Sequence, residues 1–543
     1  MKNQKKEKPG FGIRVSGSVQ CKENTAKTLV RQVIITLLLN LFAVHPVISD
    51  VNLPDIFGDN MVFQSGMKLP VWGTADPGES VTVSINGNSA MTKTGKDRHW
   101  MIEMEKMEAG GPYKMIITGN NTITFTNVMI GEVWVCSGQS NMQWTVKATK
   151  GIDDEVASAD YPDIRLFTVD RVSKETPQYD FSGKRPMWTP CNPKTVLDFS
   201  AVAFFFGREL HEKLNTPIGL IKSCWGGSVA EAWMRFETIE STPELKPIID
   251  NLDSVIAAYP EAKERYDKKI AEQQKARAEG KAVKEYILPP RGPGERDYPS
   301  GLYNAMLAPM IPYGIRGVIW YQGESNSVRA HQYRTLFPTM IRDWRKAWKQ
   351  GNFPFLFVQL SNWETDNVAV QRGWGSWPEL REAQLMTLSV PNTAMAVTID
   401  IGDESNIHPN NKWDVGHRLA LGALHVAYGS DVIYSGPIYK SMKIDGNSIR
   451  LLFEHVSDGL GNGDGGSLRG FAIAGKNRVF YPAVARIESD EVIVTSNKVS
   501  EPVAVRYGWD DNPECNLFNS AGLPASPFRT DNWQGITEGK LKP

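Results

Sequence analysis

The residues best suited to chemistry lie in the stretch "EVWVCSGQSNMQW", from Glu132 to Trp144. An apolar run typical of a buried strand ends there in Gly138-Gln139-Ser140-Asn141-Met142. A serine at such a strand-to-helix turn presents its hydroxyl, which becomes a nucleophile when an imidazole accepts its proton. The alternative is that Ser140 only caps the helix. The rest of the sequence must supply the imidazole.

A suitable imidazole occurs in "DIGDESNIHPNNK", which follows another predicted strand. His408 lies at this strand exit beside carboxylates, whereas four other histidines fall in helical stretches; its alternative role is that of a loop residue bonded to backbone. The imidazole also needs an acceptor on its second nitrogen, for which Asp403 and Glu324 are the candidates. If Glu324 is structural instead, it pairs with Arg316 or Arg329.

Acyl transfer also requires hydrogen-bond donors for the charge that develops on the carbonyl oxygen. Ser140 can offer its own backbone N–H. Gly227, after the predicted strand "PIGLIKSCWGG", has no side chain to prevent close approach of its N–H. The carboxamide of Gln322 or Asn326, after "IRGVIWYQG", is a further candidate donor. The order serine, carboxylate, histidine on successive strands favours catalysis over three unrelated structural roles.

The elements that must position these residues are five apolar runs, each followed by a polar loop and a helical stretch. They are "EVWVCSG", "PIGLIKSCWGG", "IRGVIWYQG", "FPFLFVQL" and "TAMAVTIDIG". Nearly continuous apolar strands of this kind indicate a parallel sheet that is covered on both faces. In open α/β sheets the ligand lies beyond the carboxyl ends of the strands, where the residues above are found.

The chain of 543 residues is too long for one ordinary core. Short alternating strands over 50–128 predict a β domain of the sandwich type. The α/β pattern covers 129–430, and alternation returns over 431–543, which predicts a second β domain. A charged, helix-favouring insertion at about 243–290 is either a solvated addition or a cap over the active site.

The N-terminus predicts a targeting segment. Basic residues precede the apolar run Val33–Val44, which indicates a secretory signal peptide over 1–49 and a secreted or periplasmic protein. The run is shorter than the roughly 20 apolar residues that span a membrane, although an uncleaved anchor is the alternative. Four cysteines remain after the signal, too few for a disulfide scaffold, and Cys136 and Cys224 lie in apolar runs typical of buried positions.

The composition narrows the class of partner. Lys and Arg number 60 against 61 Asp and Glu, a balance that gives no support for nucleic acid as the main partner. No CxxC or HExxH spacing occurs, so we expect neither a metal nor a cofactor. We also expect no stable membrane partner, and the sequence leaves the oligomeric state open.

Six stretches together resemble the SGNH-hydrolase superfamily, and within it the sialate O-acetylesterase family of carbohydrate esterases. They are "GDNMVFQ", "GEVWVCSGQSNM", "KSCWGGSVAEAW", "SGLYNAMLAPMIPYGIRGVIWYQGESN", "LREAQ" and "NIHPNNKWDVGHRLA". The resemblance extends over nearly the whole chain after the signal. It implies a three-layer α/β/α catalytic domain with a parallel sheet, flanked by N- and C-terminal β-sandwich-like domains.

The resemblance also implies roles for the residues. Ser140 is expected to be the nucleophile and His408 the general base, with Gly227 and the carboxamide donor in the oxyanion hole. Many related esterases carry an aspartate three residues before the histidine, where this chain has Ser405. The orienting carboxylate must therefore be Asp403 or Glu324. Asp403 is favoured because it shares the loop of His408, and a dyad with a backbone acceptor is the alternative.

The sequence thus predicts a serine esterase that removes O-acetyl groups from an O-acetylated glycan through an acyl-enzyme, with sialic acid as the leading substrate. Gln139, Asn141 and Trp225 flank the predicted nucleophile and oxyanion hole and are expected to contact the sugar. The alternatives are an acetyl xylan or other plant-polysaccharide acetylesterase and, in another class, a carbohydrate-binding protein without catalysis.

A sialate substrate also requires a cation for its carboxylate. Arg329, Arg372 and Arg381 lie near the motifs in sequence and are the candidates. Arg381 is included among the predicted substrate-binding residues.

Overall fold

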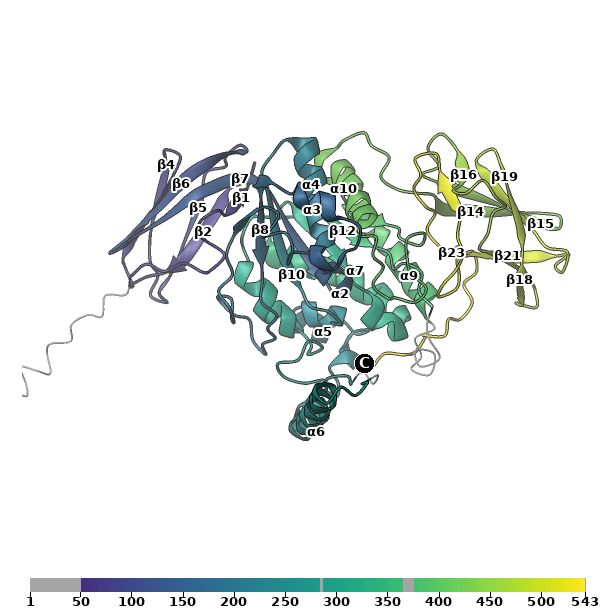
Figure 1. Cartoon of the computed structure of the whole chain (residues 1–543), viewed down its shortest axis with the longest axis horizontal. Coiled ribbons are helices and arrows are strands. Elements are labelled where there is room, and N and C mark those ends of the chain that lie inside the picture. The colour runs from purple at the N-terminus through teal and green to yellow at the C-terminus, as the bar shows by residue number, and fades with distance from the viewer. Residues whose placement is uncertain (1–49, 284–286, 365–375, 543) are drawn as a thin grey trace, which may run out of the picture. The chain divides into compact units, whose positions relative to one another are not determined.

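A single long strand, β7 (Thr122–Gly138), organises the fold (Figure 1). Its first part pairs antiparallel with β6 (Gly110–Thr118), and its last part pairs in parallel with β10 (Ile218–Cys224) and β11 (Gly317–Tyr321). The boundary predicted between residues 128 and 129 therefore falls inside one continuous strand and not in a linker.

The computed structural model describes residues 50–283, 287–364 and 376–542. The predicted signal peptide at 1–49 and Arg372 lie outside the described residues. Residues 50–543 form one compact unit.

The central strands run in the order β13–β12–β11–β7–β10–β8–β9. The pairs from β13 to β8 are parallel, whereas β9 runs antiparallel to β8. The α/β class is confirmed, but the sheet is mixed and not purely parallel. The remaining strands of this order are β8 (Tyr161–Thr168), β9 (Thr189–Cys191), β12 (Phe355–Val358) and β13 (Thr393–Ala396).

Every residue of β10, β11 and β12 is buried, because helices and loops cover both faces of these strands. One helix, α4, packs against β10 and against α10, and α10 also packs on β12 and β13. Another pair, α7 and α9, pack on each other. The helices of this region are α2 (Ser140–Gln143), α3 (Asp153–Ala157), α4 (Ala201–Leu214), α5 (Phe236–Ser241), α6 (Leu252–Ala278), α7 (Ala330–Trp348), α9 (Trp377–Met386) and α10 (Trp413–Tyr428).

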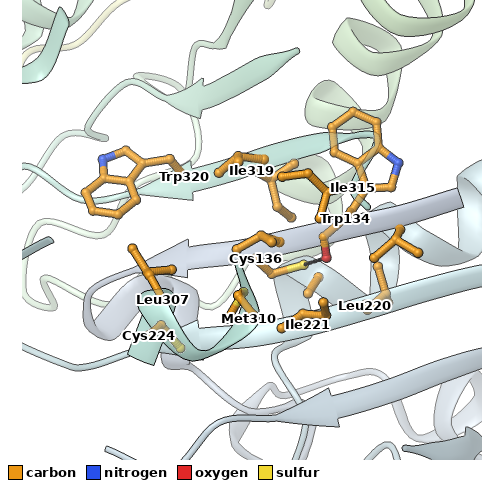
Figure 2. Close-up of a cluster of buried hydrophobic side chains, with 14 of the residues drawn as sticks. Trp134, Cys136, Leu220, Ile221, Cys224, Leu307, Met310, Ile315, Ile319 and Trp320 are labelled. Atoms are coloured by element: carbon orange, nitrogen blue, oxygen red, sulfur yellow. Dashed lines mark hydrogen bonds between the residues drawn. The ribbon is translucent and has the colours of Figure 1, made fainter. Parts of the chain in front are cut away.

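The centre of the sheet is filled by large apolar side chains (Figure 2). Trp134 on β7 and Trp320 on β11 are both fully buried, and Cys136 lies between the neighbouring strands. Burial raises the pKa of the Cys136 thiol and raises that of Cys224 to about 11, so neither is poised to form a thiolate. The prediction that both are small buried hydrophobes is confirmed, and all four cysteines of the described residues are free.

The N-terminal strands add a β region to this sheet. β3, β4 and β6 join it through β7, while β2 and β5 pair separately, and the two groups share one apolar core with the α/β region. The strands are β1 (Val62–Gln64), β2 (Leu69–Thr74), β3 (Ser80–Ile85), β4 (Asn88–Lys93), β5 (His99–Met104) and β6.

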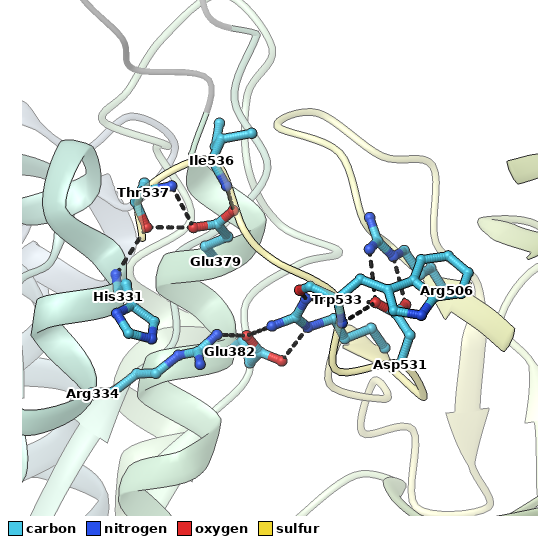
Figure 3. Close-up of polar contacts among 10 residues, drawn as sticks. His331, Arg334, Glu379, Glu382, Arg506, Asp531, Trp533, Ile536 and Thr537 are labelled. Carbon is cyan, nitrogen blue, oxygen red and sulfur yellow. Dashed lines mark hydrogen bonds and ion pairs between the residues drawn. The ribbon is translucent and has the colours of Figure 1, made fainter. Parts of the chain in front are cut away.

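The C-terminal region is rich in β-structure, as predicted, and has its own apolar core. Its two main sheets have the orders β14–β15–β20–β19 and β18–β17–β21–β23. Polar contacts tie the end of the chain to α7 and α9 (Figure 3). The strands are β14 (Ile438–Asp445), β15 (Ser448–Glu454), β16 (Leu460–Asn462), β17 (Phe471–Gly475), β18 (Phe480–Pro482), β19 (Val484–Glu488), β20 (Glu491–Thr495), β21 (Pro502–Tyr507), β22 (Leu517–Asn519) and β23 (Phe528–Arg529).

The predicted insertion contains the long helix α6, of which Leu252 alone is buried. This burial fits the solvated addition of the two alternatives left by the sequence. Among the helices that the structure describes, none combines the length and apolarity needed to cross a membrane.

Candidate active site

Ser140 is the first residue of α2, at the carboxyl end of β7. Gly138 has a φ of 134°, and a Cβ at this position would collide with the backbone of Tyr321, so the tight turn into α2 depends on glycine. The cap position of α2 is held by Gln139, and no side chain caps the helix. The alternative role of Ser140 as a helix cap is therefore wrong. Its half-buried hydroxyl has no hydrogen-bond partner among the described residues.

Two contacts hold the loop of His408 against α2. The Asn141 Nδ2 atom donates to the backbone carbonyl of Ile407 at 3.0 Å. The imidazole of His408 stacks on the indole of Trp144, with ring centroids 5.4 Å apart and planes inclined by 22°. The neighbours of Ser140 thus contact His408 and its neighbour, although the two side chains themselves share no hydrogen bond. The structure brings both predicted residues to one edge of the sheet.

The environment of His408 favours a neutral imidazole. Burial lowers its pKa from the ordinary value, and the charge of Lys412 lowers it further. A neutral ring can accept a proton, which is what a general base requires.

Neither predicted carboxylate orients this ring through a direct bond. Asp403 accepts hydrogen bonds from the hydroxyl and the N–H of Ser405, at 2.8 and 2.9 Å, and these bonds lower its pKa. Glu324 is buried, and its Oε1 accepts from Asn141 Nδ2 at 2.7 Å while Oε2 has no partner among the described residues. Burial raises the pKa of Glu324. The triad contact predicted for Asp403 is absent from this arrangement.

The end of β10 supplies the second wall of the site. Gly226 donates its N–H to Gln143 Oε1 at 2.7 Å, and a Cβ on Gly226 would lie 3.3 Å from that of Ser140. Gly227 has a φ of 75°, and a Cβ there would lie 2.6 Å from the guanidinium of Arg296. The backbone N–H groups of Ser140 and Gly227 have no acceptor within the described ranges. These two groups suit an oxyanion hole.

The two carboxamides differ in what they can still donate. Gln322 is fully buried, and its Nε2 donates to Asn326 Oδ1 at 2.7 Å and to the carbonyl of Ser228 at 3.3 Å. Both of its N–H groups are used, so the prediction of Gln322 as an oxyanion donor does not hold. Asn326 Nδ2 donates to Glu231 at 2.8 Å and keeps a second N–H. The role of Asn326 as an oxyanion-hole donor therefore stays a prediction.

Residues 130–425 match the family described as carbohydrate esterase, sialic acid-specific acetylesterase. The chain belongs to this family. The predicted family is thus confirmed, and with it the class of carboxylic ester hydrolase.

Individual relatives agree with this family. The sialate O-acetylesterase of Mus musculus is 30% identical over 517 residues, covering 84% of this chain and 90% of that protein. The sialate O-acetylesterase of Homo sapiens is 28% identical, with 84% and 88% covered. A carbohydrate acetylesterase from Xanthomonas citri of known structure is 36% identical with a TM-score of 0.76, covering 89% of this chain and 100% of that one.

The predicted sugar contacts of this esterase have different surroundings. Asn141 is buried, its Oδ1 accepts from Lys412, and its N–H groups bind Glu324 and the Ile407 carbonyl. Both of its N–H groups are used, so only its Oδ1 could contact substrate, and this contact stays a prediction. Gln139 is buried and accepts from the N–H of Ser325 at 3.3 Å, whereas Trp225 is half-buried. Their contacts with substrate remain predictions.

The prediction that Arg381 binds a substrate carboxylate is also wrong. This esterase buries Arg381 completely, and its guanidinium donates to four backbone carbonyls at 2.6–2.9 Å. Arg329 is buried as well, where it pairs with Glu231. Neither guanidinium is available to a ligand.

The sequence did not single out Lys412, Gln143 or Trp144 as members of the site. Lys412 stands in the stretch "NIHPNNKWDVGHRLA", but a lysine before a helix is ordinarily exposed. Its burial follows from the packing of α10 on the sheet, which no local pattern shows. In the described part of the chain, no group of His, Cys, Asp and Glu is arranged to hold a metal ion.

Proposed function

We propose that this esterase hydrolyses O-acetyl esters on carbohydrates through an acyl-enzyme on Ser140, with O-acetylated sialic acid as its leading substrate. The observation that carries the proposal is the unpaired Ser140 hydroxyl on the helix that contacts the His408 loop. The family description and the names of the relatives support the substrate class.

In the first half of the reaction, His408 accepts the proton of Ser140 while the serine oxygen attacks the acetyl carbon. The charge that forms on the carbonyl oxygen is stabilised by the N–H groups of Ser140 and Gly227, with Asn326 as a further donor. The bond between the acetyl carbon and the sugar oxygen then breaks, and His408 returns the proton to the departing sugar hydroxyl.

In the second half, water attacks the acetyl group on Ser140 and gives a proton to His408. The bond between the serine oxygen and the acetyl carbon breaks, acetate leaves, and the serine recovers its proton. Lowering the pKa of His408 keeps the base form available in mildly acidic solution. We assign the orientation of His408 to a backbone acceptor, with Asp403, after exchange of its Ser405 contacts, as the alternative.

We assign the catalytic region to the three-layer α/β/α SGNH type, flanked by β-sandwich-like domains. The packing of α4 and α10 against β10, β12 and β13 supports this assignment. We also propose export through the segment at 1–49. Cell fractionation with N-terminal sequencing of the mature protein tests this, and an intact N-terminus in the cytoplasm would refute it.

The substrate is tested by acetate release from 9-O-acetylated sialosides, acetylated xylan and acetylated pectin, with Ser140→Ala as the control. We expect the highest kcat/KM on the sialosides and none of this activity in the control. A large preference for xylan would make the protein a plant-polysaccharide acetylesterase. Binding of these glycans without acetate release would make it a carbohydrate-binding protein.

A further inference from the structure

A buried amine lies next to the proposed catalytic pair. Lys412 immediately precedes α10 and has no exposed surface. Its Nζ donates to Asn141 Oδ1 at 2.6 Å and lies 5.8 and 5.5 Å from the ring centroids of Trp144 and Tyr321. Burial of an amine is unfavourable unless partners compensate for its lost hydration. The Asn141 oxygen and the two aromatic rings are the partners that surround this amine.

The side chain of Asn141 connects this amine to the loop of His408. Its Oδ1 accepts from Lys412, and its Nδ2 donates to Glu324 at 2.7 Å and to the Ile407 carbonyl at 3.0 Å. Ile407 directly precedes His408. One amide thus joins α2, which begins with Ser140, to the loop that carries the base.

We infer that Lys412 is a positioning residue of the esterase: it orients the Asn141 amide that holds the His408 loop. The inference rests on the proposed roles of Ser140 and His408.

The orientation follows from hydrogen-bond chemistry. A carboxamide has nearly the same shape in its two flipped forms, so its partners decide which form is adopted. The amine of Lys412 donates, whereas the Glu324 carboxylate and the Ile407 carbonyl accept. This set of partners fixes Oδ1 toward Lys412 and Nδ2 toward the other two. Without the amine, the Asn141 oxygen loses its donor.

The charge of the same amine has a second consequence, which depends on the groups that face Lys412. They are Glu324 after β11, Tyr321 on β11 and His408 in the preceding loop. Burial lowers the pKa of Lys412 to about 7 against the attraction of Glu324, whose own pKa is raised by burial. Below that pH Lys412 carries its proton, which is the range in which His408 would gain one. The positive charge of Lys412 is therefore present in the pH range in which His408 would otherwise become protonated.

The test is Lys412→Met in the full chain, assayed with p-nitrophenyl acetate across acidic and alkaline pH. Methionine keeps the length of the side chain but has neither charge nor donor. We expect kcat to fall at least about tenfold because the base is misplaced, with little change in KM. The acidic limb of kcat/KM should move to higher pH, because removal of the charge raises the pKa of His408.

The matched control is Lys150→Met. Lys150 is an exposed lysine near the site. Its backbone, and not its side chain, bonds Asn410 in the loop that carries His408. We expect this variant to keep the wild-type kcat and the wild-type acidic limb.

A second variant covers the case in which the single substitution prevents folding. Lys412→Met combined with Glu324→Gln removes both charges together, which leaves no lone buried ion. We expect it to fold, with a kcat below that of Glu324→Gln alone and the acidic limb again at higher pH than in the wild type. Wild-type kcat and an unmoved limb in either variant would overturn the inference. If Ser140→Ala also kept its activity, the proposed function itself would fail, and loss in Ser140→Ala alone would refute only the role of Lys412.

Discussion

Ser140 differs from an ordinary serine at the start of a helix because its hydroxyl binds nothing in the described chain. In a capping serine, the hydroxyl oxygen would accept a hydrogen bond from a backbone N–H of the first turn. Neighbouring amide side chains make the structural contacts instead. Asn141 donates to the His408 loop, and Gln143 accepts from the N–H of Gly226. The nucleophile is thus left free while its surroundings are tightly bound.

The pH dependence of the reaction should reflect the surroundings of His408. Burial and the charge of Lys412 lower its pKa below the ordinary value of 6.5. A base with a lowered pKa stays unprotonated further into the acidic range, so activity is lost only as the pH falls through that lower value. We expect the acidic limb of kcat/KM to lie below pH 6.5. A limb at or above that pH would contradict this environment.

The two candidate carboxylates should respond differently to loss of charge. Asp403→Asn should lower kcat/KM about twofold at most, because the carboxylate bonds Ser405 and its loss is a surface change. Glu324→Gln should lower it about tenfold, because Glu324 is buried and binds the amide that holds the His408 loop. Steady-state kinetics of both variants show which of the two carboxylates contributes more to kcat/KM. The reverse order would restore Asp403 as the orienting residue.

The sequence located the residues of the site better than it located their contacts. Ser140 and Gly227 follow the ends of β7 and β10, and His408 lies in the loop after β13, on the edge where the carboxyl ends of parallel strands meet. Gln322 was expected to donate to the oxyanion and Arg381 to bind substrate, but the hydrogen bonds of both are satisfied inside the protein. Whether a polar side chain faces a ligand or is satisfied internally depends on packing between distant segments, and the same limit hid Lys412.

At the scale of elements, β7 shows what a local pattern can and cannot tell. Its first residues alternate between exposed and half-buried, and every residue from Val128 onward is buried. The change of pattern at residue 128 is real, and it led to a predicted domain boundary. The strand nevertheless continues, because the change marks the point where new neighbours cover both faces and not a break in hydrogen bonding.

Glu132 on β7 should be important for stability. Its carboxylate accepts from Ser65 at 2.6 Å, Arg316 at 2.5 Å and Tyr428 at 3.0 Å, which connects β7 to three other segments. Glu132→Ala leaves these donors without their acceptor and should destabilise the fold by about 2–3 kcal/mol, since the exposed part of Arg316 can be solvated. Thermal unfolding measures the effect as a lower Tm.

The control for this substitution is Lys68→Met, which removes an ion pair whose side chains are 62% and 58% exposed. Such surface pairs contribute about 0–1 kcal/mol, so its Tm should barely change. A Glu132→Ala variant no less stable than this control would show that the carboxylate is dispensable.

At the scale of the whole molecule, the C-terminal β region is fastened to the α/β region by buried polar groups. Arg381 on α9 binds the carbonyls of Asp510 and Asp511, and Glu382 pairs with Arg529. Glu379 accepts from the N–H of Thr537 (Figure 3). The sequence predicted two successive regions but not this attachment, because its partners lie more than a hundred residues apart.

Arg381→Met should loosen this attachment. Four backbone carbonyls lose their donor, so limited proteolysis should release the C-terminal region faster than in the wild type. Any loss of activity should be similar on sialosides and on p-nitrophenyl acetate. Unchanged proteolysis with a raised KM for sialosides alone would instead make Arg381 a substrate-binding residue.

Ser140 should become covalently acylated during turnover. The most direct measurement is peptide mass spectrometry after treatment with a serine-directed fluorophosphonate, in parallel with hydrolysis of p-nitrophenyl acetate. We predict one adduct, on Ser140, that forms as activity is lost. Ser140→Ala should neither be labelled nor retain more than about a thousandth of the wild-type kcat. A Ser140→Ala enzyme that turns over normally, or an inhibited enzyme labelled elsewhere, would show that Ser140 is not the nucleophile.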